Sequence, residues 1–236
     1  MSFRADAPHP RAPRRELARL GPVEQLGAGR LTRRLTQLLG GLVLYGLTIA
    51  MLIRGTLGNA PWDVLHQGLA EHLPVDIGGA LIIVSALVLL LWIPLRELPG
   101  LGTIANAILI GVASDVFLAL ISAPDALAAR IALTLAGVGL NGLATALYIG
   151  SQFGPGPRDG LMTGLHRRTG LSIRLVRTCM EVTVVAVGFL LGGTVGLGTL
   201  LYALAIGPMV QLFLPYAIVE LPDAAPVDVE EAAEAV

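Results

Sequence analysis

The stretch GNAPWDVLHQGL, residues 58–69, recurs 96 residues later as GPGPRDGLMTGL, residues 154–165. Both stretches have a Gly at the start, a Pro, an Asp two residues after that Pro, and then the pattern Leu-x-x-Gly-Leu. The same shift of 96 residues aligns GLGT at 100–103 with GLGT at 196–199. One register that holds from the first half of the chain to the second predicts an internal duplication, in which each copy carries one such short element.

The composition predicts an integral membrane protein. Of the 236 residues, 54% are hydrophobic and only 14% are charged, and the mean hydropathy is +0.74. Soluble domains carry about 25% charged residues, so this chain has too little polar surface for a water-soluble globule, and the lipid bilayer is its expected partner. A spanning helix needs about 20 mostly apolar residues. Six runs have roughly this length: 35–53, 77–95, 101–121, 129–149, 173–192 and 197–216.

These runs divide the chain into five parts. Residues 1–34, with eight Arg against three acids, are expected to form a basic, disordered tail, and residues 217–236 an acidic, disordered one. Between them we expect membrane repeat 1 at 35–121, a loop at 122–128 and membrane repeat 2 at 129–216. Because short cytoplasmic loops and ends of membrane proteins are enriched in Arg and Lys, both termini are expected in the cytoplasm.

The short segments at 58–72 and 154–168 decide the topology. Each can hold about a dozen helical residues, or about 17 Å at 1.5 Å per residue, roughly half of the bilayer core. If neither spans, each copy crosses the membrane three times, so the second copy enters from the opposite side. The predicted fold class is therefore an all-α integral membrane protein with six spanning helices plus two short half-helices, built as two inverted-topology repeats. Eight spans also keep Arg167 and Arg168 inside and remain the alternative.

The short segments supply the first candidate residues of a substrate or ion pathway. Pro suits the first turn of a helix, and an Asp there complements the free N–H groups and the positive end of the helix dipole. Inverted repeats with broken helices that meet near the bilayer midplane are typical of transporters. The carboxylates are helix caps, groups that line a pathway, or both at once. The candidates are Asn59, Pro61, Asp63, Pro157, Arg158 and Asp159.

Ionisable side chains inside the predicted spans are a second set of candidates, because they are costly in a membrane. Glu181 lies near the middle of its span, and Arg177 and Arg174 precede it by four and seven residues, so the three share one helix face. They form either a snorkelling, paired structural group or a polar stripe that lines a path for an anion or a zwitterion. Asp115 completes this set, and Asn141, which is polar but uncharged, is a further candidate that is expected to join helices by hydrogen bonds.

Other classes of site find no support in the sequence. His66, His72 and His166 lack metal-ligand spacing and are expected at the membrane interface. GVGLNG at 137–142 matches a dinucleotide motif, but it lies in an apolar span with no preceding strand. The N-terminal arginines suit anionic lipid better than nucleic acid. We therefore expect no enzyme activity, no metal, no cofactor and no nucleic-acid partner.

Two quoted stretches carry a family resemblance. APWDVLHQGLAEHL, residues 60–73, and GPRDGLMTGLHRRTGLSI, residues 156–173, resemble the signature stretches of the YczE/YyaS/YitT family of bacterial integral membrane proteins, closest to its YczE-like branch. The resemblance covers about residues 38–216 and leaves out both tails. It implies a polytopic protein of the bacterial cytoplasmic (inner) membrane and a transport role, and it brings no catalytic residues to carry over.

The repeat and the charged stripe together predict a secondary transporter or exporter for a small molecule or ion. The alternative is a membrane protein that transports nothing and anchors or assists a partner enzyme. In that case the polar residues serve only helix packing.

Overall fold

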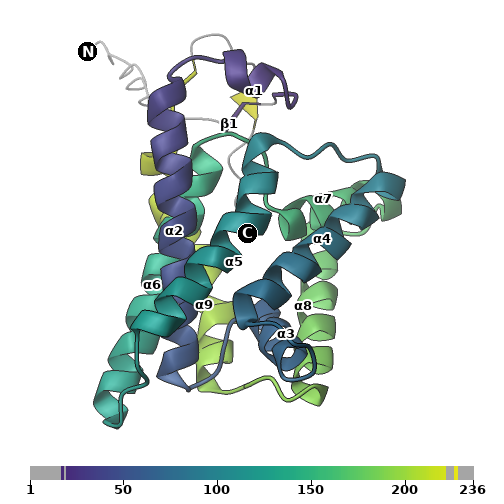
Figure 1. Cartoon of the computed structure of the whole chain (residues 1–236). Helices are drawn as coiled ribbons and strands as arrows, with labels where there is room; N and C mark the ends of the chain where they lie inside the picture. The colour runs from purple at the N-terminus through teal and green to yellow at the C-terminus, as the bar shows by residue number, and fades with distance from the viewer. Residues whose placement is uncertain (1–16, 19, 222–225, 228–236) are drawn as a thin grey trace, which may run out of the picture.

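The computed structural model describes residues 17–18, 20–221 and 226–227, and this part of the chain is almost entirely helical (Figure 1). Five helices are long and apolar enough to cross a membrane: α2 (Leu31–Gly55), α4 (Ile77–Leu95), α5 (Leu101–Leu120), α6 (Leu127–Gly150) and α9 (Leu197–Ala217). The remaining helices are α1 (Glu24–Gly27), α3 (Pro61–Ala70), α7 (Pro157–Thr169) and α8 (Ile173–Leu190). Two short strands, β1 (Leu17–Ala18) and β2 (Pro226–Val227), pair antiparallel.

The helix α8 corresponds to the predicted span at 173–192 and is not among the five. It contains three charged residues, Arg174, Arg177 and Glu181, within 18 residues, whereas each of the five candidate spans has an 18-residue stretch with at most two. Its length of about 27 Å, at 1.5 Å per residue, is still close to the ~30 Å of a bilayer core. The structure therefore gives five spans by length and composition, and α8 differs because of its charges.

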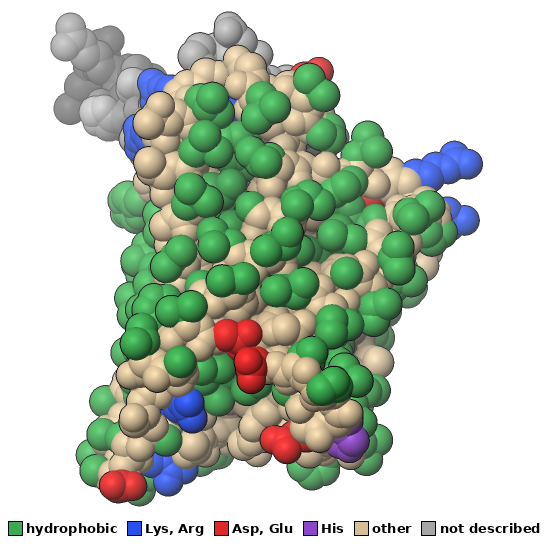
Figure 2. All heavy atoms as spheres, in the orientation of Figure 1, with side chains coloured by type: hydrophobic (Ala, Val, Ile, Leu, Met, Phe, Trp, Pro, Cys, Tyr) green, Lys and Arg blue, Asp and Glu red, His purple; other side chains and the backbone are tan. Residues whose placement is uncertain are grey.

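The outer surface of the helices suits a lipid environment. Figure 2 shows hydrophobic side chains over most of the visible face, with charged side chains mainly toward its two ends. Large apolar side chains on α4 and α5 point outward, among them Leu87, Leu90, Ile93, Val116 and Leu120, each more than half exposed. Exposed apolar patches of this extent are rare on soluble monomers, so this surface is a membrane-facing one.

Four pairs of helices begin 96 residues apart. The starts are Leu31 and Leu127 for α2 and α6, Pro61 and Pro157 for α3 and α7, Ile77 and Ile173 for α4 and α8, and Leu101 and Leu197 for α5 and α9. The register found in the sequence is thus also the register of the helix boundaries.

Residues 96 apart also make matching contacts. The helices α2 and α6 lie side by side, and in Figure 1 α2 runs downward while α6 runs back up. Gly41 of α2 lies against Leu147 of α6, and Gly137 of α6 lies against Met51 of α2. Likewise α2 packs on α5 as α6 packs on α9, and α3 packs on α8 as α7 packs on α4. Each half of the molecule therefore places its short helix against the other half.

A break in the chain precedes each short helix. Gly58 and Gly154 have φ angles of +115° and +99°, which a residue with a side chain adopts only under strain. The carbonyl just before each of these glycines accepts a hydrogen bond from the other half, from Gly198 of α9 in the first case and Gly102 of α5 in the second, both at 2.7 Å. The breaks are thus held in place, and α3 and α7 lie toward opposite ends of the molecule (Figure 1).

The structure differs from the sequence prediction at the start of the membrane region. The helix α2 begins at Leu31, and residues 20–30 include α1, whose Gln25 is buried. Arg34, placed by the sequence in the basic tail, is fully buried. The boundary at residue 34 therefore falls inside folded structure, and so does the one at residue 217, because Ile218 and Val219 are buried. The remaining parts of the two predicted tails, residues 1–16, 19, 222–225 and 228–236, lie outside the described residues.

Candidate functional site

The two short helices bring Asp63 and Asp159 to the interior of the molecule. In each helix Pro is the first residue, and the residue before it is extended, with ψ of 151° at Ala60 and 163° at Gly156. This geometry suits the Pro ring and directs the chain into the helix. The two carboxylates then lie in the first turn, at 5% and 7% exposure.

Two small cavities lie between the helices. The first has a volume of about 50 Å³ and the second about 30 Å³, so each has room for a few water molecules and is far smaller than a ligand pocket of about 300–1,000 Å³. Residues of the first include Trp62, Asp63, His66, Leu81, Val84, Ser85, Asn106 and Ile110. Residues of the second include Arg158, Asp159, Met162, Arg177, Met180, Glu181, Tyr202 and Ile206.

The two cavities are equivalent under the repeat. Each residue named for the second cavity follows by 96 the residue named in the same place for the first. Trp62 and Arg158, which are themselves such a pair, line both cavities. The cavities therefore occupy corresponding places in the two halves and share a wall made of this pair.

Asp159 is surrounded by polar partners. Its Oδ2 accepts a hydrogen bond from the Tyr148 hydroxyl at 2.5 Å and from the Gly156 N–H at 3.2 Å. The Nε of Arg158 lies 3.6 Å from its Oδ1. Arg158 also donates to the Tyr45 hydroxyl at 2.7 Å. The carboxylate is thus held by groups from α6 and α7, and its guanidinium neighbour is anchored on α2.

Asp63 has a different environment. Its Oδ1 lies 3.2 Å from Nδ1 of His66, which is one turn further along α3 and equally buried. Both side chains line the first cavity.

A hydrogen-bonded chain joins the helices beside the cavities. Asn141 of α6 donates to the Thr48 hydroxyl of α2 at 2.7 Å and accepts from the Tyr202 hydroxyl of α9 at 2.8 Å. Tyr202 also lines the second cavity. Asn141 therefore joins three helices by hydrogen bonds, as expected from the sequence.

The other sequence candidates divide into those at the cavities and those elsewhere. Arg177 and Glu181 pair at 3.0 Å on α8 and line the second cavity. Arg174 is exposed and lines neither cavity. Asp115 accepts a hydrogen bond from the Gly78 N–H at 2.7 Å, where it joins α5 to the start of α4.

The rest of the short-segment candidates lie at the helix starts. Pro157 lines the first cavity, whereas Pro61 is the buried first residue of α3. Asn59 is buried in the break before α3 and donates to the Gln67 side chain at 2.6 Å.

The sequence reasoning missed several aromatic residues and one histidine. Tyr45, Trp62, Tyr148 and Tyr202 lie in apolar runs or beside a motif residue, so nothing local marked them. His66 was expected at the membrane interface, but it is 5% exposed and lines a cavity. Its position one turn after Asp63 was the available signal. In the described part of the chain, no group of three or more His, Cys, Asp or Glu could hold a metal ion.

A family model matches residues 32–215, which contain the residues of both cavities, α2 apart from its first residue, and the helices α3 to α8 in full. Its description is that of a family of unknown function, DUF6198. The chain belongs to this family.

Curated relatives agree with the DUF6198 assignment. An uncharacterized protein of Haemophilus influenzae is 44% identical over 177 residues, which is 75% of this chain and 81% of the relative. The uncharacterized membrane protein YczE of Bacillus subtilis is 33% identical over 190 residues, or 80% of this chain and 88% of YczE. YyaS of the same organism is 26% identical over 179 residues, or 74% and 89%. The YczE-like resemblance is thus confirmed, and no solved structure matches the chain.

Proposed function

We propose that this DUF6198 protein is a secondary transporter of the bacterial cytoplasmic membrane for a small molecule or ion, and that it is not an enzyme. The observation that carries the proposal is the pair of equivalent cavities that share the wall formed by Trp62 and Arg158. In transporters built from inverted repeats, substrate sites lie at the repeat interface beside discontinuous helices. Here the shared wall is the start of α3 and α7.

The proposed topology has six spans, with α8 as the sixth, and two half-helices. The opposite directions of α2 and α6, and the positions of α3 and α7 toward opposite ends, support two inverted copies (Figure 1). The charges of α8 favour its place beside a water-accessible path, because ionisable groups in spans face a bundle interior or a cavity. The arginines at the start of α2, Arg30, Arg33 and Arg34, favour a cytoplasmic N-terminus, and an even number of spans would return the C-terminus to the same side.

The mechanism we propose is an alternating exchange between the two halves. Two copies of one fold can adopt two different conformations, and exchanging those conformations opens one cavity while it closes the other. Both cavities are small in this structure, so the substrate enters only after α3 or α7 has moved. Trp62 and Arg158 then form the barrier that separates the two sides.

The proposal is tested by flux into liposomes. Purified protein is reconstituted and assayed against a panel of labelled amino acids, small organic acids, organic cations and sugars. We expect saturable uptake of at least one class, and loss of that uptake in Arg158→Ala. The matched control is Arg167→Ala, which removes an exposed arginine of the same helix, where it pairs with Glu97. Folded protein that moves no member of the panel contradicts transport and favours a role as an anchor for a partner enzyme.

A further inference from the structure

The repeat produces two equivalent buried carboxylates, Asp63 and Asp159, whose surroundings differ. Where Asp159 has Tyr148 and Arg158, the residues 96 positions earlier in the sequence are Leu52 and Trp62. Both replacements are unable to neutralise a carboxylate. Conversely, Asp63 has His66 one turn later, and the residue at the corresponding position beside Asp159 is Met162.

These substitutions leave one carboxylate satisfied and the other dependent on a histidine. Asp159 accepts hydrogen bonds from a phenol and a backbone N–H and lies beside a guanidinium, which is always charged. Within the described residues, the hydrogen-bond or ion-pair partner of Asp63 is His66. Histidine is the side chain whose charge changes between about pH 5 and pH 8. Asp63 therefore lies beside a side chain that can gain a proton, whereas Asp159 lies beside a guanidinium whose charge is fixed.

The charged and titratable groups around the two cavities support the same distinction. Arg158 of α7 pairs with Asp159, and Arg177 of α8 pairs with Glu181. Both pairs line the second cavity. On α5, Asp115 is held by the Gly78 N–H, and the cavity residues of α4 and α5 are neutral, Ser85 and Asn106 among them. The phenol of Tyr45 on α2 lines the first cavity together with Asp63, and that of Tyr202 on α9 lines the second. Of the three carboxylates that line the cavities, Asp159 and Glu181 each pair with an Arg, whereas the ion-pair partner of Asp63 is His66.

We propose that Asp63 and His66 form the proton-binding site of this protein, and that Asp159 is a fixed structural carboxylate. With Asp63 ionised and His66 neutral, the pair carries one negative charge. One proton taken from water in the first cavity makes the pair neutral, either as carboxylate and imidazolium or as carboxylic acid and imidazole. Because Nδ1 of His66 lies 3.2 Å from Oδ1 of Asp63, the proton is shared by the two groups. Its use as a coupling ion rests on the proposed transport function.

Proton binding is tested without any transported compound. Infrared difference spectra of the reconstituted protein are recorded between about pH 8 and about pH 5, for wild type, Asp63→Asn, His66→Gln and Asp159→Asn. Subtracting a variant's spectrum from that of the wild type removes the bands of all other histidines and carboxylates. We expect both the Asp63→Asn and the His66→Gln subtractions to show carboxyl and imidazole bands, and these bands to persist in Asp159→Asn.

Two outcomes overturn the proposal. One is an unchanged wild-type difference spectrum in both Asp63→Asn and His66→Gln. The other is loss of the same bands in Asp159→Asn, which would show that the proton binds at Asp159 and not at Asp63. Asp63→Asn and His66→Gln each test the pair, so the experiment still decides if one of the two variants does not fold. A negative flux assay with intact bands would remove the transport function and leave the proton site standing.

Discussion

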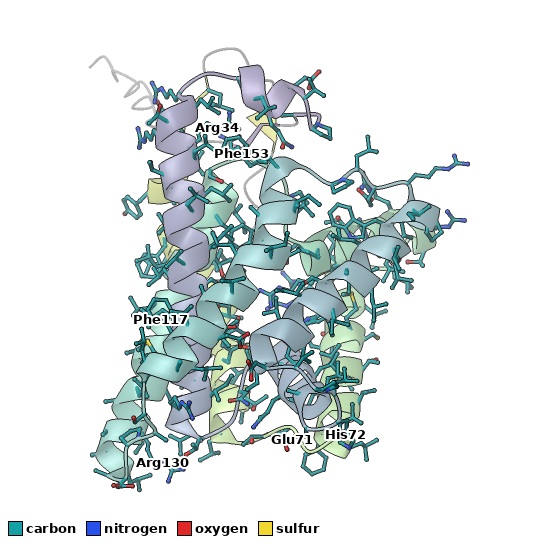
Figure 3. The ribbon with its side chains drawn as sticks, viewed as in Figure 1. Arg34, Glu71, His72, Phe117, Arg130 and Phe153 are labelled. Carbon is teal, nitrogen blue, oxygen red and sulfur yellow. The ribbon has the colours of Figure 1, made fainter. Side chains whose placement is uncertain are left out.

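The guanidinium carbon of Arg34 lies 4.1 Å from the centre of the Phe153 ring, at the end of the molecule where α2 begins (Figure 3). The same guanidinium donates hydrogen bonds to the carbonyl oxygens of Gln25, Ser151 and Gln152, at 2.6, 2.8 and 2.7 Å. Arg34 thus stabilises the break that follows α6, which leads into α7. One buried arginine of α2 thus connects α1 to the turn that follows α6.

We predict that Arg34→Gln destabilises the protein by about 3 kcal/mol or more, because it strands buried carbonyl groups that lose charged donors. Lys restores the charge but not the fork of donors, so Arg34→Lys should also be destabilising. The measurement is the melting temperature in detergent. Arg33→Ala, which removes the exposed neighbouring arginine, should change stability by less than about 0.5 kcal/mol. Equal melting temperatures for the Arg34 and Arg33 variants would show that this network is not stabilising.

Arg34 also shows what sequence alone could not provide. The positive charge of Arg34 and its position just before an apolar run predicted that it lies in the cytoplasm, next to the first membrane span. That prediction used only the neighbouring sequence. Its partners Ser151 and Gln152 lie 117 and 118 residues away, and two of its three acceptors belong to a turn in which Gln152 has φ of +60°. Nothing in either stretch marks this pairing, because carbonyl acceptors are common to every residue.

A second prediction concerns the hydroxyl of Tyr148. Tyr148→Phe removes the 2.5 Å hydrogen bond to Asp159 and leaves a buried carboxylate with one donor fewer, which should cost about 1–3 kcal/mol. Tyr216→Phe, at a tyrosine that is 78% exposed, is the matched control and should be neutral. Detergent melting curves of the two variants give the comparison. If Tyr148→Phe melts like Tyr216→Phe, the hydroxyl does not hold Asp159.

The internal repeat predicted the features that the two copies share, but it did not predict how their two cavities differ. Matched Gly, Pro and Asp residues located both short helices, and helix-start chemistry predicted that Pro61 and Pro157 lie in the first turn, where the structure has them as the first residues. The cavities differ through positions that are not identical in the two copies. A phenol at 148 and a Leu at 52 look equally suited to an apolar span, so the sequence treated the two carboxylates as equals.

A third prediction tests the chain breaks. Gly58→Ala should be the most damaging of three Gly→Ala variants, because a Cβ there would lie 2.6 Å from the Gly196 nitrogen in addition to the strain of φ +115°. At Gly154 the nearest atom is 3.2 Å away, and at Gly170, with φ +71°, nothing lies within 4 Å. Gly170→Ala thus measures backbone strain alone, about 1–2 kcal/mol. The expected order of melting temperatures is Gly170→Ala, Gly154→Ala and then Gly58→Ala as the lowest, and the reverse order would contradict the packing of the breaks.

A fourth prediction tests the topology. Glu71 and His72 lie at the end of the molecule opposite Arg34 (Figure 3), just after α3, whereas Arg168 is in the last turn of α7. On a Cys179→Ser background, His72→Cys and Arg168→Cys should react with a membrane-impermeant thiol reagent from opposite faces of the membrane, with residue 168 cytoplasmic. Intact cells and inverted vesicles give the two sides. Reaction of both from the cytoplasm would mean that the short segments span and that the copies are parallel.

The last prediction concerns Arg177 and Glu181, which pair at 3.0 Å with both side chains about one-quarter exposed or less, beside the second cavity. Arg177→Ala leaves Glu181 without its cation in an apolar setting and should lower the melting temperature more than Glu181→Gln, which keeps an uncharged group of the same shape. In the double variant Arg177→Ala with Glu181→Gln, part of the lost stability should return, because the stranded charge is gone. The double-mutant cycle measures that coupling.

Glu181→Gln should in contrast reduce flux in liposomes far more than it reduces stability. Glu181 lines the second cavity, where it occupies the place that Ser85 has in the first. Additive stability losses across the cycle, together with normal flux in Glu181→Gln at every pH, would show that the pair is neither a structural ion pair nor part of the pathway.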